Sequence, residues 1–381
     1  MKKNITTILI SFVICFVSCN SISKNFESDD KDSLVIQLIT YVLDQAHYLD
    51  IGIDDNFSEK VFDAFLENID PYKRYLYQSD IEILSKYKYE IDDAFNQPNL
   101  EFFNLAYEIL IQRIDEAKQI SQEVLSKPFD FQLEEIFNFD IEELQYVNTR
   151  TNLVERWRKL MKLYLIENFH DEIKEDERTF KKDSTFKARS YSEIEIETRE
   201  ILNETMADYF VIMEEEFQRQ HWFSIYLNSF VSQYDPNTSY LDPEDRDRFN
   251  IDMSGNYAGI GAVLRKKVDK IEITELISGG PAWRNNSLEK GDVILKVRQE
   301  NDSEPVSIVG YRLADAVKLI KGEKGTNVYL TVKKVDGTVS EISIERDIVL
   351  LEETYIKSSL VENDGNNYGI INIPKFYIDF E

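Results

Sequence analysis

The chain has few of the residues on which several common kinds of site depend. Its 381 residues include only two cysteines and three histidines. The histidines, His47, His170 and His221, are far apart, and no Cys/His cluster has the spacing of a zinc site. The carboxylates show no calcium-loop spacing, so we expect no bound metal. Because no Gly-x-Ser-x-Gly sequence accompanies them, we expect the histidines to lie in the core or on helix surfaces rather than in a catalytic triad.

Positive charge is also scarce. Lys and Arg number 44 against 71 Asp and Glu, which leaves a formal net charge of -27. Proteins that bind nucleic acid or anionic lipid cluster their basic residues, so we exclude both as main partners. The acidity suits solubility better than recruitment of basic substrates. Gly259-Ile260-Gly261 lacks the third glycine of a dinucleotide loop, and we expect no cofactor.

Apolar residues make up 43% of the chain, which is enough to fill cores in two to three domains. From Ser33 to about Tyr234 they recur at helical spacing, as in Val61, Phe62, Phe65 and Leu66. We expect Trp157 and Trp222 to lie in that helical core. Residues 171–199 mix charges densely, which favours a mobile loop or a solvated helix edge over a binding site.

The N-terminus has the pattern of a targeting segment. Lys2 and Lys3 precede an apolar run from Ile8 to Val17 that is too short to span a membrane, and we expect residues 1–18 to be a signal peptide. Cys19 follows Phe-Val-Ser, which resembles a bacterial lipobox. We therefore expect a lipid on Cys19, the only thiol left after cleavage there. The alternative is an ordinary signal peptide cut near Ser18 or beyond.

These features place the protein in a cell compartment. A lipobox predicts a membrane-anchored lipoprotein in the periplasm of a Gram-negative bacterium, with the lipid as its only contact with the membrane. Residues 19–33 are polar and acidic, and we expect them to form a flexible tether.

Turn and strand signals from Gly255 to Arg346 indicate a small β-rich module. We expect strands over residues 263–267, 270–276, 293–297, 327–335 and 338–346, and a helix over 311–321. Asp336-Gly337 predicts a tight hairpin. Gly259-Ile260-Gly261-Ala262 places two glycines before the first strand, where open N–H groups can bind an anion such as a terminal carboxylate.

The order of these elements, with GIGAVL, SGGPA and LEKGDVILKV, resembles a circularly permuted bacterial PDZ domain. More closely, it resembles the PDZ domain of the C-terminal processing, or tail-specific, serine proteases. Asp235-Pro236-Asn237-Thr238-Ser239-Tyr240-Leu241 is similar to that family's DPHTSYL, and residues 368–377 to its strand leading into the protease core. Ala46-His47-Tyr48 and Ile69 to Leu76 resemble its helical N-terminal domain.

The resemblance implies a multidomain α+β fold. It divides the chain into a mostly α-helical N-terminal domain (34–234), a connection (235–254), a PDZ domain built as a small β-barrel or sandwich with two helices (255–350), and the first strand of a missing α/β protease core (351–381). An incoming tail would pair with the strand that contains Val263 and Leu264, and its carboxylate would bind N–H groups of the loop. Leu313 and Val317 would receive its last side chain or only fill the core.

The resemblance also implies a serine-lysine dyad, which that family carries beyond the PDZ domain. We therefore expect this chain to be an N-terminal fragment without peptidase activity, and assign no catalytic residue. The Ser-x-x-Lys spacings at Ser85, Ser184 and Ser287 are interpreted as chance. Two hypotheses remain: the substrate-recognising half of a tail-specific endopeptidase for polypeptides with apolar C-termini, with an adaptor protein as a possible partner, or a non-catalytic PDZ lipoprotein that tethers protein partners.

Overall fold

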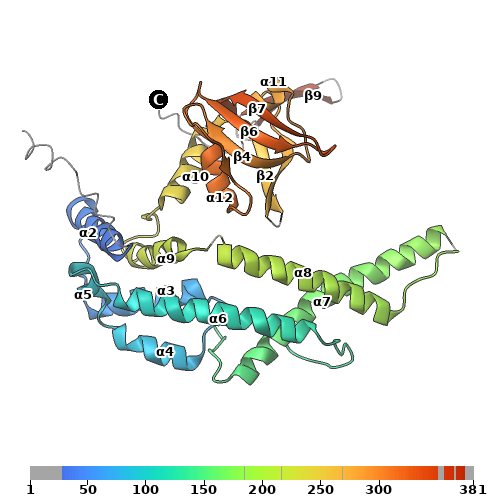
Figure 1. The fold of residues 1–381 in the computed structure, drawn as a ribbon. Helices are drawn as coiled ribbons and strands as arrows, with labels where there is room; N and C mark the ends of the chain where they lie inside the picture. The colour runs from blue at the N-terminus through green and yellow to red at the C-terminus, as the bar shows by residue number, and fades with distance from the viewer. Residues whose placement is uncertain are drawn as a thin grey trace, which may run out of the picture. The chain divides into compact units, whose positions relative to one another are not determined.

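The chain forms two compact units (Figure 1). The first, called the helical unit, holds residues up to 211 and residues 219–240. The second, called the β unit, holds residues 212–218 and those from 241 onward. The computed structural model describes residues 28–183, 185–215, 217–267, 269–350, 356–363 and 366–373. The expected signal peptide and Cys19 lie outside these ranges.

The helical unit is an assembly of helices. Their bounds are α2 Ser28–Ala46, α3 Asp55–Ile69, α4 Gln78–Leu84, α5 Ile91–Asn96, α6 Glu101–Leu125, α7 Arg150–Lys182, α8 Tyr191–Glu215 and α9 Arg219–Val231, with a 3₁₀ turn, η1, at Ser85–Tyr87. Asp54 and Thr149 cap α3 and α7, because their side chains accept backbone N–H groups of the first turn. The helix α3 packs against α5 and α9, and α6 packs against α7 and α9 (Figure 1).

Aromatic side chains fill the core of the helical unit. The rings of Phe95 and Phe230 stack with centroids 3.6 Å apart, and the fully buried Tyr226 lies against Phe65 and Phe103. Trp157 and Trp222 are buried, as expected. None of the described helices is both long enough and apolar enough to cross a membrane.

The start of the helical unit differs from the expected tether. Residues 28–33 are helical, because α2 begins at Ser28. Asp32 is buried and pairs with Arg219 on α9, so this turn is tied to the rest of the unit. Acidic residues at a helix N-terminus also stabilise the helix through its dipole. A polar, acidic composition was therefore insufficient to predict an unstructured segment here.

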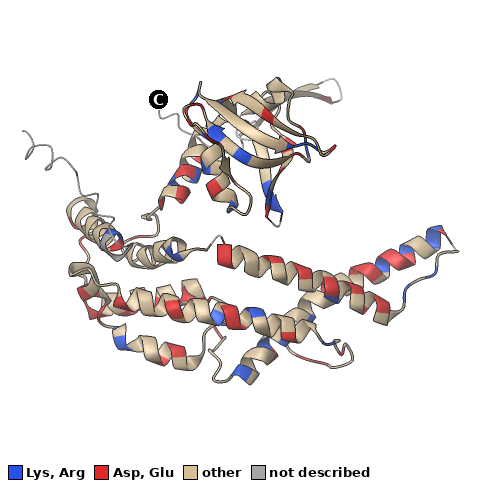
Figure 2. Ribbon diagram, in the orientation of Figure 1, with Lys and Arg blue, Asp and Glu red and all other residues tan. Residues whose placement is uncertain are grey.

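The charged segment 171–199 lies mostly on helices. It spans the end of α7, a short connection and the start of α8, and acidic residues are spread along both helices (Figure 2). Arg189 in the connection donates to Asp176 on α7 at 2.7 Å. The expectation of a solvated helix edge is confirmed.

The β unit is built around one sheet. Its elements are α10 Pro243–Ser254, β1 Asn256–Gly259, β2 Ala262–Lys267, β3 Lys270–Leu276, α11 Pro281–Asn285, β4 Val293–Gln299, β5 Val306–Ser307, α12 Leu313–Ile320, β6 Asn327–Lys333, β7 Val339–Glu345, β8 Asp347–Leu350, β9 Lys357–Asn363 and β10 Asn366–Asn372. The sheet runs β2-β3-β4-β6-β7, with β5 added to β4 and all pairs antiparallel. Separate antiparallel pairs join β1 to β8 and β9 to β10.

Alternation along the strands explains the core of this unit. Val328, Leu330 and Val332 on β6 are fully buried, whereas their neighbours along the strand are at least partly exposed. Gly337 has φ +89° in the β6–β7 turn, which confirms the hairpin predicted from Asp336-Gly337. The predicted strands and helix match β2, β3, β4, β6, β7 and α12, and the fold class is confirmed.

Candidate peptide-binding groove

The loop between β1 and β2 is held against the turn that precedes α11. The N–H of Ala282 donates to the carbonyl of Ile260 at 2.7 Å, and the N–H of Ile277 donates to that of Gly261 at 2.9 Å. The Ile260 side chain is buried in the core of the β unit. The position of this loop is therefore set by backbone bonds on one side and an apolar anchor on the other.

The backbone at Gly261 has a conformation and surroundings that only glycine fits without strain. Its φ is +71°, and a Cβ atom there would lie 3.2 Å from the Gly280 Cα and 3.3 Å from Val349. Glycine adopts this left-handed conformation at no steric cost. Gly259 is not in the left-handed region, and a Cβ there would meet the ring of Tyr257 at 3.0 Å. The two glycines therefore serve different purposes, and only Gly261 needs an unusual backbone conformation.

The loop offers hydrogen-bond donors that the protein itself leaves unused. Among the backbone bonds of the described chain, the N–H groups of Ile260 and Gly261 have no acceptor. The next strand, β2, begins at Ala262 and pairs only with β3 within the described sheet. Its other edge presents N–H and C=O groups that can pair with an added strand.

The helix α12 packs against β2, so its apolar residues lie beside the strand that has an open edge. Leu313 is half-buried and packs on the core together with Ala262 and Leu264. Val317 is also half-buried, but it is not among the residues packed on that core. Val263 is exposed. The eight residues predicted for peptide binding lie at the end of β1, in the loop, on β2 and on α12: Gly259, Ile260, Gly261, Ala262, Val263, Leu264, Leu313 and Val317.

Lys321, which the sequence reasoning missed, lies beside the loop. A Cβ atom at Gly259 would be 3.7 Å from its Cγ, and its Nζ lies 5.0 Å from the centroid of the Tyr257 ring. Burial lowers the pKa of this half-buried lysine. It forms no ion pair with the carboxylates of the described chain. A lysine that directly follows a helix has no distinctive sequence signal, so only the structure reveals this cation.

Arg346 fixes the end of α12. This buried guanidinium donates to the carbonyls of Ile320 at 2.8 Å and Leu319 at 3.2 Å, and to the Gln299 side chain at 2.7 Å. The last carbonyls of a helix lack partners within it, so a basic group there stabilises its terminus. Arg346 therefore positions the helix that faces β2.

The other catalytic patterns of the sequence do not form a site among the described residues. Lys88 pairs with Glu59 at 2.9 Å, and the Ser85 hydroxyl donates to the Ile81 carbonyl at 2.6 Å. Ser287 and Lys290 are exposed, and Ser184 lies outside the description. The described part of the chain contains no group of three metal-ligating side chains.

Comparison with known families matches both units. The model of the tail-specific protease N-terminal domain matches residues 39–244, and the PDZ domain model matches residues 248–333. The chain is 32% identical over 351 residues to a tail-specific protease of Haemophilus influenzae, covering 92% of this chain and 47% of that protein. It is 36% identical over 145 residues to a probable CtpA-like serine protease of Staphylococcus aureus, covering 38% of this chain and 26% of that protein. The chain thus spans half or less of the length of these curated relatives.

Two solved structures are similar to parts of the chain. The PDZ domain of the carboxy-terminal protease from Vibrio cholerae, solved in complex with peptide, is 42% identical; the match covers 25% of this chain and 97% of that one, with a TM-score of 0.24. The photosystem II D1 C-terminal processing protease is 18% identical; the match covers 52% of this chain and 46% of that one, with a TM-score of 0.25.

Proposed function

The chain belongs to the tail-specific protease family, and we propose that it captures the apolar C-termini of polypeptides in its PDZ domain for proteolysis. The observation that carries this proposal is the open edge of β2 beside a loop with two unused N–H groups. A peptide tail can satisfy both, because its backbone adds to the strand while its carboxylate accepts from the loop.

The groove suits a tail with one negative charge and an apolar last residue. The N–H groups of Ile260 and Gly261 and the ammonium of Lys321 supply donors for the carboxylate. Val317 is half-buried without packing on the core of the β unit, so it can cover the last side chain. Leu313 contributes to the core and to the wall of the groove.

The finer parts of the proposal concern the reaction and its place. We propose a serine nucleophile with a lysine base, as the family resemblance implies, and assign it to neither Ser85 nor Ser287. That assignment would be contradicted if this chain cleaved an unfolded protein and Ser85→Ala or Ser287→Ala abolished the cleavage. We place the protein in the periplasm of a Gram-negative bacterium, anchored through a lipid on Cys19, where an adaptor protein could deliver substrates.

A peptide titration tests tail capture. The probe is a fluorescein-labelled decapeptide that ends in three apolar residues, with either a free or an amidated C-terminus. We expect the free peptide to bind the chain at least about tenfold more tightly, because charge-assisted hydrogen bonds are lost on amidation. Equal affinities for the two peptides would refute carboxylate capture.

Two variants locate the binding. Lys321→Met should reduce the preference for the free peptide, since it removes a cation beside the loop. Lys318→Met is the matched control, because Lys318 is exposed on α12, the helix that Lys321 follows, and pairs with Glu244 at 2.6 Å. Val317→Asp should weaken both peptides. If Lys321→Met prefers the free peptide as strongly as Lys318→Met does, Lys321 is excluded from the site.

A further inference from the structure

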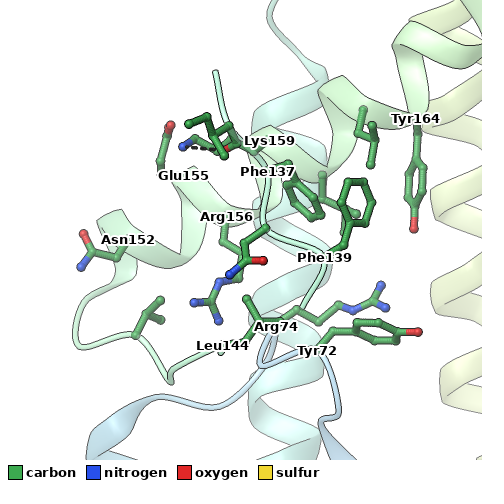
Figure 3. Close-up of a pocket in the computed structure, with 15 residues that line it drawn as sticks. Tyr72, Arg74, Phe137, Phe139, Leu144, Asn152, Glu155, Arg156, Lys159 and Tyr164 are labelled. Atoms are coloured by element: carbon green, nitrogen blue, oxygen red, sulfur yellow. Dashed lines mark hydrogen bonds between the residues drawn. The ribbon is translucent and has the colours of Figure 1, made fainter. Parts of the chain in front are cut away.

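We propose that the helical unit contains a second binding site for a free polypeptide C-terminus, separate from the PDZ groove. The site is a cavity of about 450 Å³ between the start of α7, the connection that follows α6, and the turn after α3 (Figure 3). This volume lies in the range of small-ligand pockets. The choice of a polypeptide C-terminus as ligand rests on the proposed function, whereas the position of the site rests on the cavity alone.

One wall of the cavity is apolar and partly open to solvent. The rings of Phe137 and Phe139 lie edge to face with centroids 5.0 Å apart, and Leu144, Leu163 and Tyr164 line the same space. Phe139 is 69% exposed and the neighbouring Ile136 is 87% exposed. Large apolar side chains at a concave site are typical of ligand pockets. A bound apolar side chain would cover them.

Three basic side chains line the same cavity, although the protein is strongly acidic. Arg74, Arg156 and Lys159 form no ion pair with any carboxylate of the described chain. Glu155 is the one acidic residue in the lining, and Arg158 already binds it at 2.7 Å. Three cations without an ion-pair partner, beside aromatic rings, indicate a ligand that combines an anion with an apolar group.

These cations are held in place before any ligand binds. The backbone of Arg74 is fixed at both ends, because its N–H donates to Asp70 at 2.8 Å and its carbonyl accepts from Trp157 Nε1 at 2.9 Å. Arg156 donates to the carbonyls of Lys73 and Gln145, which leaves it with N–H donors to spare. The Asp70-Pro71-Tyr72-Lys73-Arg74 motif thus presents Tyr72 and Arg74 to the cavity.

The long connection between α6 and α7 is held against α7 by two lysine side chains. Lys162 donates to the Leu133 carbonyl at 2.8 Å and to Glu135 at 2.7 Å, and Lys159 reaches the Ile136 carbonyl at 3.4 Å. Segments of this length without helix or strand are commonly functional. These hydrogen bonds hold the connection so that Phe137 and Phe139 lie over the start of α7.

The charge around the cavity favours a chain terminus over an acidic internal segment. Glu134, Asp140, Glu142 and Glu143 on the same connection are all exposed and would repel a polyacidic partner. A free C-terminus needs only one carboxylate, carried next to an apolar last side chain. The arrangement therefore matches a tail that ends in an aromatic or branched residue.

The test uses the full chain with Val317→Asp as background, so that the PDZ groove is weakened. The probe is a fluorescein-labelled decapeptide with polar internal residues and a free Leu-Phe terminus, followed by fluorescence anisotropy. We expect Arg74→Met and Phe139→Ser each to weaken binding at least tenfold. Lys127→Met and Phe180→Ser, exposed on the same unit and outside the cavity, should change it less than twofold. Unchanged binding in both cavity variants would overturn the proposal.

Two more peptides and a crosslink complete the test. The amidated probe should bind at least tenfold more weakly, and so should an amidated peptide with an internal Glu beside Leu-Phe. Equal binding of the latter would overturn the assignment to a chain terminus. A photoreactive phenylalanine at the penultimate position should crosslink to residues 136–164. Crosslinks confined to other regions would also refute the site.

The two binding events are separable. In the Arg74→Met, Phe139→Ser double variant with an intact Val317, a remaining preference for the free peptide reports on the PDZ groove alone. If that preference is lost while the crosslink to residues 136–164 remains, the proposed function is refuted and the second site stands. The reverse pattern would refute only the second site.

Discussion

The Nε2 atom of His47 lies 2.7 Å from the Oδ2 atom of Asp235, across 188 residues of sequence. Both side chains are buried. In the tautomer with its proton on Nε2, the ring donates to Asp235 and Nδ1 accepts the N–H of Leu49 at 3.1 Å. Asp235 also accepts the N–H groups of Asn237 and Thr238. The end of α2 is thereby tied to the turn that leaves the helical unit.

Removal of this histidine should destabilise the helical unit. We expect His47→Ala to lower its free energy of unfolding by about 1–3 kcal/mol, because a buried acceptor loses a hydrogen-bond donor. Urea unfolding monitored by tryptophan fluorescence measures this in a Trp283→Phe background, where Trp157 and Trp222 report on the helical unit only. His170→Ala, at an exposed site on α7, is the control and should change the free energy by less than about 0.5 kcal/mol. Equal losses in both variants would contradict the role of the pair.

Asp235 should make the helical unit sensitive to acid. Hydrogen bonds from the Thr238 hydroxyl, His47 and backbone N–H groups lower its pKa to about 2. In the unfolded chain an aspartate titrates at about 3.9. The unfolded state therefore binds more protons between these values, so the stabilisation is complete above about pH 4 and is lost as the pH falls towards 2.

The acid dependence can be checked with Asp235→Asn. Thermal unfolding of the helical unit between pH 2 and pH 6 should depend less steeply on pH in this variant, although the variant is less stable at pH 6. The same slope in both proteins would show that other carboxylates carry the effect.

Gly261 should be required for folding of the β unit as well as for binding. We expect Gly261→Ala to cost about 1–3 kcal/mol, because it combines a positive φ with close contacts to Gly280 and Val349. Gly337→Ala is the matched control, since Gly337 has φ +89° with no atom near an added Cβ, and should cost only about 1 kcal/mol. Equal costs for the two would exclude the close contacts as a cause.

Cys19 should determine where the protein is found. We expect Cys19→Ser to move it from membranes into the soluble periplasmic fraction, because the acyl chains supply the hydrophobic energy of anchoring. Fractionation and mass spectrometry of the wild type measure this. Membrane association that the variant retains, with no lipid on the wild-type protein, would refute the anchor.

Local patterns carried most of the predictable information about the β unit. Alternation predicted β2, β3 and β6, and the Asp336-Gly337 pair predicted the hairpin after β6, since both signals act between near neighbours in the sequence. The same reasoning placed Gly261 in a loop before β2. It failed for residues 28–33, where the buried pair between Asp32 and Arg219 stabilises helix.

What the sequence by itself determined is the order of helices and strands and the family resemblance; the peptide-binding residues that it suggests stay a prediction. Only the tertiary structure joined His47 to Asp235, placed Lys321 beside Gly259, and brought Arg74 into one cavity with Phe139 and Lys159. The physical reason is that hydrophobic periodicity records which face of an element is buried, whereas contacts between distant residues depend on how those elements pack.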